Sequence, residues 1–393
     1  MLWRKLVAPK FELDIPTLLR SGQAFRWRKI DEIWSCALND QIVLIRESHK
    51  DGDQIIEYSH IDSLNPQINV SLETGEFLYK YFNLDQSTSD LYQHWAKIDS
   101  HFPTFHKSTT MGILETPPNS ERQTPIDDDS FNGVRILSQD PWETLISFII
   151  SSNNNIKRIS QLCEILCISY GQYVNDFNNI PYYTFPQPND FFRNSKLITS
   201  FEKVKLENEL RQLGFGYRAK YITKTVSAMI ESPALFEKLH SGSWNTDEEC
   251  LAFLRQFDGV GPKVADCVAL MGCHRDDLVP VDTHVWKVLR NTYRDEFNYW
   301  VDVLDSEELI DYTKSNLKKA LGNKSVDTKV YPFVKQFFKE FWKKKAGWAQ
   351  AVVFSSIVKL DNGINSEEDV KKLIAKVSEI EGDIRSFKRI KRE

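Results

Sequence analysis

Lys263 and Asp282 are the two side chains of this sequence whose types and surroundings best fit covalent chemistry. Lys263 falls in the first turn of a helix expected over Pro262–Met271. The positive end of a helix disfavours a cation and partial burial adds to that cost, so the neutral amine is favoured there. A neutral amine is a nucleophile for carbon and can form a Schiff base. Asp282 precedes a second expected helix, Thr283–Asn291, and a carboxylate beside the lysine would stabilise positive charge on a sugar.

Both residues also have simpler interpretations. Lys263 could hold a phosphate, or could pair with Asp266 at i+3 along the same helix. Asp282 could be the N-cap of the following helix, a role that aspartate often fills and that a catalytic role does not exclude. However, Cys267 at i+4 and Met271 at i+8 place Lys263 on an apolar stripe, which is unusual for a lysine unless it faces a cavity.

The lysine follows a glycine-rich turn. Gly259 and Gly261 lie between helices expected over Thr246–Gln256 and Pro262–Met271. Glycine allows a tight turn with positive φ, and the N–H groups at a helix start suit a phosphate oxygen. The stretch 257–263 is therefore predicted to form a hairpin that grips a nucleic-acid backbone without reading its sequence. A plain corner between two helices explains the same pattern.

The elements that must hold these residues indicate an α+β protein. Residues 1–115 carry strand-like runs and two helical patterns, so we expect an N-terminal antiparallel β-sheet domain with helices. Residues 131–360 follow a helical period, and Asp140-Pro141-Trp142-Glu143 is a clear helix start, so we expect an all-helical domain that contains the hairpin. The remaining segments are expected to be a flexible linker over 116–130, a loop over 174–200 and a charged tail over 361–393.

The composition of the whole chain narrows the possible functions. With 393 residues and a net charge of −5, the chain is not strongly basic, so a nucleic-acid surface must be a local patch. Its six cysteines form no CxxC pair, which favours the reduced thiols of an intracellular protein. The same pattern argues against zinc and iron–sulfur sites, and we expect neither a metal nor a cofactor. No apolar run approaches the roughly 18 residues of a membrane span, so no membrane association is expected.

Five ordered blocks together give a more specific signal. The hairpin run Gly259–Gly272, followed by Val279–Trp286, resembles the helix-hairpin-helix-GPD superfamily of DNA glycosylases, and within it the 8-oxoguanine DNA glycosylase/AP lyases of eukaryotes. Phe257-Asp258 departs from the Leu-Pro that is frequent in the family, and residues 295–345 match it poorly. Four further blocks agree with the family in the same order: Ser21–Trp27, Gln139–Ile156, Leu213–Ala219 and Ala346–Ala351.

The resemblance implies roles for residues in these blocks. Lys263 would be the nucleophile that forms the Schiff base, and Asp282 would be the family's aspartate beside it. An extruded base would lie in a pocket next to them. The groups around that base would be Gly22 as the acceptor for N7–H, Gln350 at the Watson–Crick edge, and Cys267 with Phe354 on the two faces.

The resemblance also implies contacts with the DNA strands. Asn153 would fill the space left by the extruded base, and Tyr217 would wedge beside it. Arg158 and Arg218 would hold the unpaired cytosine, and His284 would lie near a phosphate of the lesion strand. Each block alone has an ordinary structural explanation, and only their joint occurrence favours the functional one. These explanations are a strand and turn for Gly22, a helix C-cap and loop for Asn153–Asn155, a helix start for Tyr217 and Arg218, and core or rim packing for Gln350 and Phe354.

The function implied is that of a bifunctional DNA glycosylase and AP lyase that excises 8-oxoguanine opposite cytosine from duplex DNA, acting as a monomer. A monofunctional glycosylase for alkylated or mispaired bases is one rival, but such relatives lack the lysine. A non-enzymatic module that clamps DNA is another, and it would leave Asp282 and Gln350 without a purpose. The resemblance and the basic run Arg385–Arg392 favour a nuclear protein, with a mitochondrial fraction as an addition.

Overall fold

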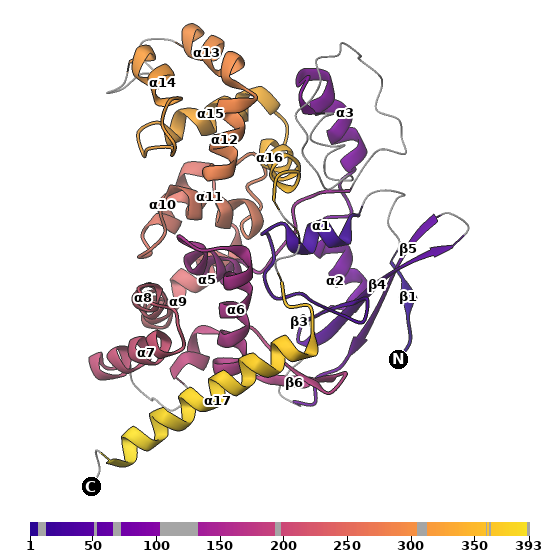
Figure 1. Cartoon of the computed structure of the whole chain (residues 1–393), viewed down its shortest axis with the longest axis vertical. Coiled ribbons are helices and arrows are strands. Elements are labelled where there is room, and N and C mark those ends of the chain that lie inside the picture. Colours follow the sequence, from indigo (N-terminus) through magenta and orange to yellow (C-terminus); the bar gives the residue numbers. More distant parts are fainter. Residues whose placement is uncertain are drawn as a thin grey trace.

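The N-terminal part of the chain is built on an antiparallel β-sheet, as predicted. A computed structural model describes residues 1–6, 13–50, 53–65, 72–102, 133–192, 198–304, 313–358, 360 and 363–390. Five strands lie in the order β1-β5-β4-β3-β2, and every neighbouring pair is antiparallel (Figure 1). The strands are β1 (Arg4–Lys5), β2 (Arg28–Ile30), β3 (Ile33–Leu38), β4 (Gln41–Lys50) and β5 (Asp53–Ile61).

Two short turns fix the register of the central strands. Asp31-Glu32 joins β2 to β3 and Asn39-Asp40 joins β3 to β4, and φ lies between +48° and +61° at all four residues. Positive φ at both central residues is typical of the type I′ turn, whose twist matches that of a hairpin. The second turn therefore sets Leu38 opposite Gln41.

Both faces of the sheet are buried, because successive side chains enter two different cores. Trp34 and Val43 pack in a small core with residues of α1 (Ile15–Arg20) and α2 (Thr74–Tyr81). Ile42 and Leu44 belong instead to the main core, which they share with the helices of the C-terminal part. The sheet is thus packed directly onto the helical part.

Helix α5 (Pro141–Ser151) is buried within the helical part and begins where the sequence predicted. Asp140 caps it by accepting a hydrogen bond from the backbone N–H of Glu143 at 2.7 Å, and Pro141 occupies the first turn. Its apolar side chains from Trp142 to Ile150 are buried on all sides, as expected for a central helix. The other helices up to residue 291 are α3 (Thr88–Ile98), α6 (Ile156–Tyr170), α7 (Ser200–Gln212), α8 (Arg218–Glu231), α9 (Pro233–Ser241), α10 (Asp247–Arg255), α11 (Pro262–Met271) and α12 (Thr283–Asn291).

The loop predicted over 174–200 is wrong for most of the segment. Two strands, β6 (Tyr173–Phe177) and β7 (Ile180–Tyr183), form an antiparallel hairpin, and a 3-10 helix, η2 (Pro188–Phe192), follows. The connection is Asn178-Asn179, with φ of +51° and +57°. Asparagine adopts positive φ more readily than most residues, so Asn-Asn can form this turn. Asn-Gly would have been a clearer signal of a hairpin in the sequence.

The C-terminal third contains more helix than predicted. Helix α17 (Glu367–Ile390) occupies most of the segment expected to be a charged tail, and runs across the helical part to the C-terminal end (Figure 1). Its buried residues Val370, Leu373 and Val377 recur every three or four positions and give it an apolar side, which packs on α6 and β7. None of the described helices combines the length and apolar character that crossing a bilayer needs. The remaining helices are α13 (Arg294–Val303), α14 (Lys314–Ala320), α15 (Tyr331–Trp342) and α16 (Ala346–Ser355).

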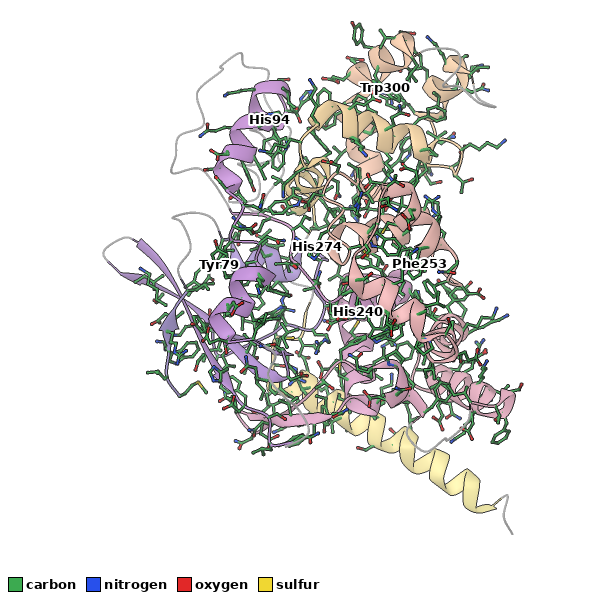
Figure 2. The ribbon with its side chains drawn as sticks, turned by 180° about the vertical axis from the view of Figure 1, so that it is seen from behind. Tyr79, His94, His240, Phe253, His274 and Trp300 are labelled. Carbon is green, nitrogen blue, oxygen red and sulfur yellow. The ribbon has the colours of Figure 1, made fainter. Side chains whose placement is uncertain are left out.

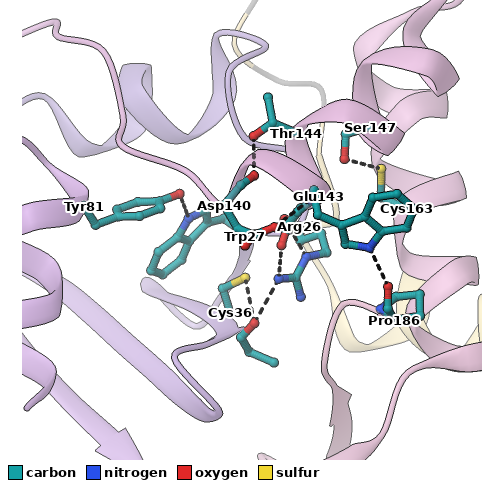
Figure 3. A network of polar contacts seen from close by, with 12 residues as sticks. Arg26, Trp27, Cys36, Tyr81, Asp140, Glu143, Thr144, Ser147, Cys163 and Pro186 are labelled. Atoms are coloured by element: carbon teal, nitrogen blue, oxygen red, sulfur yellow. Dashed lines mark hydrogen bonds and ion pairs between the residues drawn. The ribbon is translucent and has the colours of Figure 1, made fainter. Parts of the chain in front are cut away.

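A buried ion pair joins the sheet to the start of α5. Arg26 donates to both carboxylate oxygens of Glu143, at 2.8 and 2.6 Å, and also to the carbonyl of Ala37 (Figure 3). His274, which follows α11, lies at the same junction, with its Nε2 3.4 Å from the hydroxyl of Ser138 (Figure 2). The two parts are therefore held by polar contacts as well as by the shared core. The predicted linker, 116–130, lies outside the described residues.

Candidate active site

A narrow pocket lies where the sheet part meets helices α5, α11 and α16. Residues that are far apart in the sequence converge on it, which is the arrangement the ordered blocks predicted. Its two ionisable side chains that fit the predicted chemistry are Lys263 and Asp282. The lining residues are Ser21, Gly22, Gln23, Phe148, Lys263, Cys267, Met271, Pro280, Asp282, Gln350, Ala351 and Phe354.

Lys263 extends from the first turn of α11 into this pocket. The residue is partly buried, and its Nζ lies 5.1 Å from the centre of the Phe148 ring. The alternative pairing with Asp266 does not occur, because Asp266 accepts hydrogen bonds from Lys335 Nζ and the Tyr331 hydroxyl, each at 2.6 Å. The amine of Lys263 therefore faces the pocket and an aromatic ring, and does not pair with the carboxylate of its own helix.

Cys267 lies one turn further along α11 and is buried in the pocket wall. Burial raises the pKa of the Cys267 thiol to about 11, although the neighbouring Lys263 acts in the opposite direction through charge and a hydrogen bond. The thiol therefore stays protonated at neutral pH and offers a soft, uncharged surface to a flat ligand.

Asp282 caps α12 and lines the pocket at the same time. Its Oδ1 accepts hydrogen bonds from the backbone N–H groups of His284 and Val285, at 2.8 and 2.9 Å. The predicted N-cap role is therefore confirmed. Among the described residues, no hydrogen bond reaches Oδ2, so this second oxygen is available to the pocket.

Two linked hydrogen bonds at the buried Tyr331 hydroxyl, the Tyr331 relay, connect the helix of Lys263 to the segment that carries Asp282. The carboxylate of Asp266, on α11, accepts from the hydroxyl of Tyr331 on α15. The same hydroxyl accepts from the backbone N–H of Val281 at 3.1 Å, one residue before Asp282. These hydrogen bonds therefore tie the segment of Asp282 to the helix of Lys263 through α15.

Gly22 brings the N-terminal part into the pocket. Its φ is +86°, and a Cβ there would lie 3.2 Å from Ile156 and 3.7 Å from the ring of Phe354, so glycine suits this position for two reasons. The side chain of Gln23 anchors the turn, because its amide pairs with Arg135 O at 2.9 Å and Leu137 N at 3.0 Å.

Helix α16 supplies the opposite wall. Gln350 is buried and Phe354 is half-buried one turn later, so both line the pocket from one side of the helix. The ring of His284 lies edge-on to that of Phe354, with 5.9 Å between centres, and His284 is exposed at the rim.

The predicted hairpin is present next to the pocket. Gly259 has φ of +85°, and a Cβ there would meet the Tyr221 ring at 2.5 Å. Gly261 begins α11 without a side-chain cap, which leaves the first N–H groups of the helix open to an anion. The departure at Phe257-Asp258 is accommodated, since Phe257 is buried and Asp258 pairs with Lys224 on α8.

The remaining predicted DNA contacts also gather on one surface. The hydroxyl of Tyr217 and the guanidinium of Arg218 donate to the carbonyl of Ser152, and Arg218 also donates to that of Asn153 at 3.0 Å. Asn153 itself is exposed, with φ of +49°. Arg158 donates to the carbonyl of Gly214 at 3.3 Å, in the loop that leads to Tyr217.

Three residues at the candidate site carry no clear signal in the sequence. Phe148 was predicted only as part of a buried helix, yet its ring lies over the amine of Lys263. Gln23 belongs to a block that was recognised, but the sequence does not show what its amide holds. Tyr331 gave no signal, because its partner Asp266 lies 65 residues earlier in the chain.

Two family models match the chain in succession. Residues 5–145 match the N-terminal domain of 8-oxoguanine DNA glycosylase, and residues 146–298 match the HhH-GPD superfamily base excision DNA repair protein. The N-glycosylase/DNA lyase of Saccharomyces cerevisiae is 32% identical over 94% of this chain and 89% of its own. N-glycosylase/DNA lyase OGG1 of Arabidopsis thaliana is 29% identical over 90% of this chain and 79% of its own.

A solved structure shares the fold. The 8-oxoguanine glycosylase/lyase of Clostridium acetobutylicum, in complex with double-stranded DNA containing cytosine opposite 8-oxoguanine, superposes with a TM-score of 0.61. The similarity covers 90% of this chain and 97% of the bacterial one, at 22% identity. With the near full-length match to the yeast enzyme, these findings show that the chain belongs to the N-glycosylase/DNA lyase family of helix-hairpin-helix-GPD base excision repair proteins.

Proposed function

We propose that this protein excises 8-oxoguanine opposite cytosine from duplex DNA and then cuts the strand as an AP lyase. The observation that carries the proposal is the position of Lys263, whose amine enters a pocket that also contains Asp282. The yeast relative is named as an N-glycosylase/DNA lyase, and the bacterial structure contains cytosine opposite 8-oxoguanine.

Recognition begins with extrusion of the base from the duplex. Extrusion costs a few kcal/mol, and a base in a damaged pair is extruded more readily than a base in an intact pair. Tyr217 and Ser152 lie on the surface beside the hairpin, and the exposed Asn153 follows Ser152 directly, so Asn153 and Tyr217 can offset the lost stacking. The extruded base enters between Cys267 and Phe354 and meets the amide of Gln350.

The carbonyl of Gly22 distinguishes the oxidised base from guanine. The carbonyl of Gln23 is occupied by Gln139, whereas that of Gly22 has no donor among the described residues. It accepts from the N7–H of 8-oxoguanine, which guanine lacks. One unsatisfied buried acceptor costs about 1–3 kcal/mol, or roughly 5- to 150-fold, so extrusion and later steps must supply further discrimination.

The chemical step exchanges one bond at C1′ for another. The nitrogen of Lys263 bonds to C1′ through its lone pair as the glycosidic bond breaks. The base leaves with the electron pair of the glycosidic bond and takes up the proton that the nitrogen releases. Asp282 stabilises the positive charge that develops on the sugar. Opening of the sugar ring gives a Schiff base, which lets a C2′ proton leave and the 3′ phosphate depart by β-elimination.

Borohydride trapping tests the proposal. Duplex DNA with 8-oxoguanine opposite cytosine should give a covalent protein–DNA adduct with the wild type. Lys263→Gln should abolish the adduct, whereas Lys371→Gln, an exposed lysine paired with Glu367, should leave it unchanged. Base release by the wild type without any adduct would contradict the lyase step and indicate a monofunctional glycosylase. DNA binding without base release would contradict both activities and indicate a DNA-binding module.

We also propose that the protein acts on duplex DNA as a monomer, in the nucleus and to a lesser extent in mitochondria. The basic run Arg385–Arg392 supports nuclear import, since such clusters are typical of import signals. Imaging of a fluorescent fusion with Arg389 and Arg392 replaced by alanine tests the location, and should show loss of nuclear enrichment. Analytical sedimentation of the protein, alone and with duplex DNA, tests the oligomeric state and should give the mass of one chain, with or without one duplex.

A further inference from the structure

A lysine of α17 lies beside Arg158, on the surface where the DNA contacts gather. Helix α17 packs against α6, and the first turn of α6 carries Arg158. Arg158 Nη2 lies 2.7 Å from the position that a Cβ of Gly214 would take, and Lys376 Nζ lies 3.7 Å from the same position. The two cationic groups therefore converge over one glycine, which leaves room for both.

This pair of cations has no acidic partner among the described residues. Lys371 and Lys372, one turn earlier on α17, pair with Glu367 and Glu368. Neither Lys376 nor Arg158 makes such an ion pair within the described part of the chain, and the guanidinium of Arg158 donates only to the carbonyl of Gly214 there. Two neighbouring cations repel each other unless an anion neutralises them, so the arrangement favours an anion bound from outside.

The position of the pair identifies the anion. Gly214 lies in the loop that leads to Tyr217 and Arg218, and Arg218 holds the carbonyls of Ser152 and Asn153. Under the proposed function, Asn153 enters the duplex and the arginines face the unpaired cytosine. The anions that lie beside that cytosine are the backbone phosphates of its own strand.

We propose that Lys376 binds a backbone phosphate of the strand opposite the extruded base, and that α17 thereby forms part of the DNA-binding surface. The inference rests on the proposed function, because it takes the surface around Asn153 as the duplex site. It adds a residue that the family models do not reach, since the helix-hairpin-helix-GPD match ends at residue 298.

Salt-dependent DNA binding tests the proposal. Lys376→Ala should weaken binding to a duplex with an abasic-site analogue opposite cytosine by about two- to fivefold, the range expected for one exposed ion contact. It should also reduce the slope of log affinity against log salt by about 1. Lys376→Arg should restore both values, and Lys372→Ala, on an exposed lysine already paired with Glu368, should change neither.

Neutral phosphates locate the contact. In a series of duplexes, a single methylphosphonate replaces one phosphate at a time within three nucleotides of the cytosine. A second series replaces the phosphates of the lesion strand in the same way. One position on the cytosine strand should weaken the wild type and have no effect on Lys376→Ala. Finding the position whose effect is lost in Lys376→Ala on the lesion strand, or unchanged affinity and salt slope in Lys376→Ala, would overturn the inference.

The two proposals fail in different ways. These measurements read binding, and excision of 8-oxoguanine by wild type and Lys376→Ala is measured separately at saturating enzyme, where both should be equal. Absence of excision by the wild type contradicts the proposed function. Normal excision with Lys376→Ala binding like the wild type contradicts only the role of α17.

Discussion

Asp282 uses its two carboxylate oxygens for different purposes. Oδ1 caps α12 through His284 and Val285, and Oδ2 remains for the pocket. Under the proposed function, a structural role and a chemical role coexist in one side chain, so loss of activity on mutation does not by itself identify the chemistry. Two substitutions separate the roles, because asparagine caps a helix as well as aspartate and alanine does not.

Asp282→Asn should keep the fold and lose the chemistry. The amide oxygen retains the cap, so the free energy of unfolding should stay within about 0.5 kcal/mol of wild type. Base release should fall by about 10²- to 10³-fold, because the neutral amide no longer stabilises positive charge on the sugar. Urea denaturation and single-turnover excision measure the two effects. Asp282→Ala should lose about 1 kcal/mol as well, and equal excision by Asp282→Asn and wild type would remove the assigned role.

The Cys267 thiol should respond to pH in a way that reports on Lys263. A free cysteine has a pKa of about 8.5, but burial raises the pKa of Cys267 to about 11. The native thiol therefore stays protonated between these two pH values. Since the unfolded chain loses this proton first, native stability should fall as pH rises from about 8.5 towards 11. Alkylation of the Cys267 peptide, followed by mass spectrometry, should remain slow until the pH approaches the raised value.

Lys263→Gln provides the internal check on that titration. Lys263 lowers the pKa of Cys267, partly offsetting burial, so its removal should move the onset of alkylation to still higher pH. Burial also raises the pKa of the Cys163 thiol, to about 12, and because Lys263 does not contribute to that shift, Cys163 serves as the control thiol. An onset for Cys267 that does not move would show that the amine and the thiol do not interact.

Among helices and strands, the accuracy of prediction followed the strength of local signals. The sequence predicted α11 and α12 with their observed ends, and Pro262, Gly272 and Asp282 mark three of those four ends directly. The β6–β7 hairpin was missed because its turn is Asn178-Asn179, and α17 was missed because charged residues surround its narrow apolar side. Pairing of Tyr331 with Asp266 joins distant segments and has no local signature.

Tyr331→Phe should impair catalysis more than DNA binding. It removes the hydroxyl that accepts from Val281 N and donates to Asp266, leaving buried groups without a partner at a cost of about 1–3 kcal/mol. Because Asp282 follows Val281 directly, its position loosens, and kcat should fall by about tenfold while KM for DNA stays constant. Steady-state excision assays measure kcat and KM separately. Tyr299→Phe, on an exposed tyrosine of α13, is the control, and a stability loss with unchanged kcat would limit the relay to folding.

For the whole molecule, the active site depends on how firmly the sheet part is joined to the helices. Ser21–Gln23 enter the pocket from the N-terminal part, whereas Phe148, Lys263 and Phe354 come from three helices. The sequence predicted Gly22, Lys263 and Phe354 as site residues, but neither Phe148 nor the contact that aligns the two parts. That contact is the pair between Arg26 and Glu143, which is almost fully buried and doubly hydrogen-bonded.

Arg26→Met should therefore destabilise the protein and disturb the pocket together. Removing one partner of a buried ion pair leaves an uncompensated charge, which costs about 3–5 kcal/mol. The loss should appear in urea denaturation. Arg46→Met is the matched control, since Arg46 pairs with Glu57 across two strands in a more exposed position and should cost less than about 1 kcal/mol.

The double variant Arg26→Met/Glu143→Leu separates stability from alignment. With both charges replaced by apolar groups, most of the lost stability should return, because neither buried charge is left alone. Arg26 also donates to the carbonyl of Ala37, on β3, and this tie to the sheet is not restored. Excision should therefore recover less than stability does, in single-turnover assays below the unfolding temperature. Equal recovery of both would mean that the shared core alone aligns Gly22 with Lys263, and that the ion pair contributes only to folding.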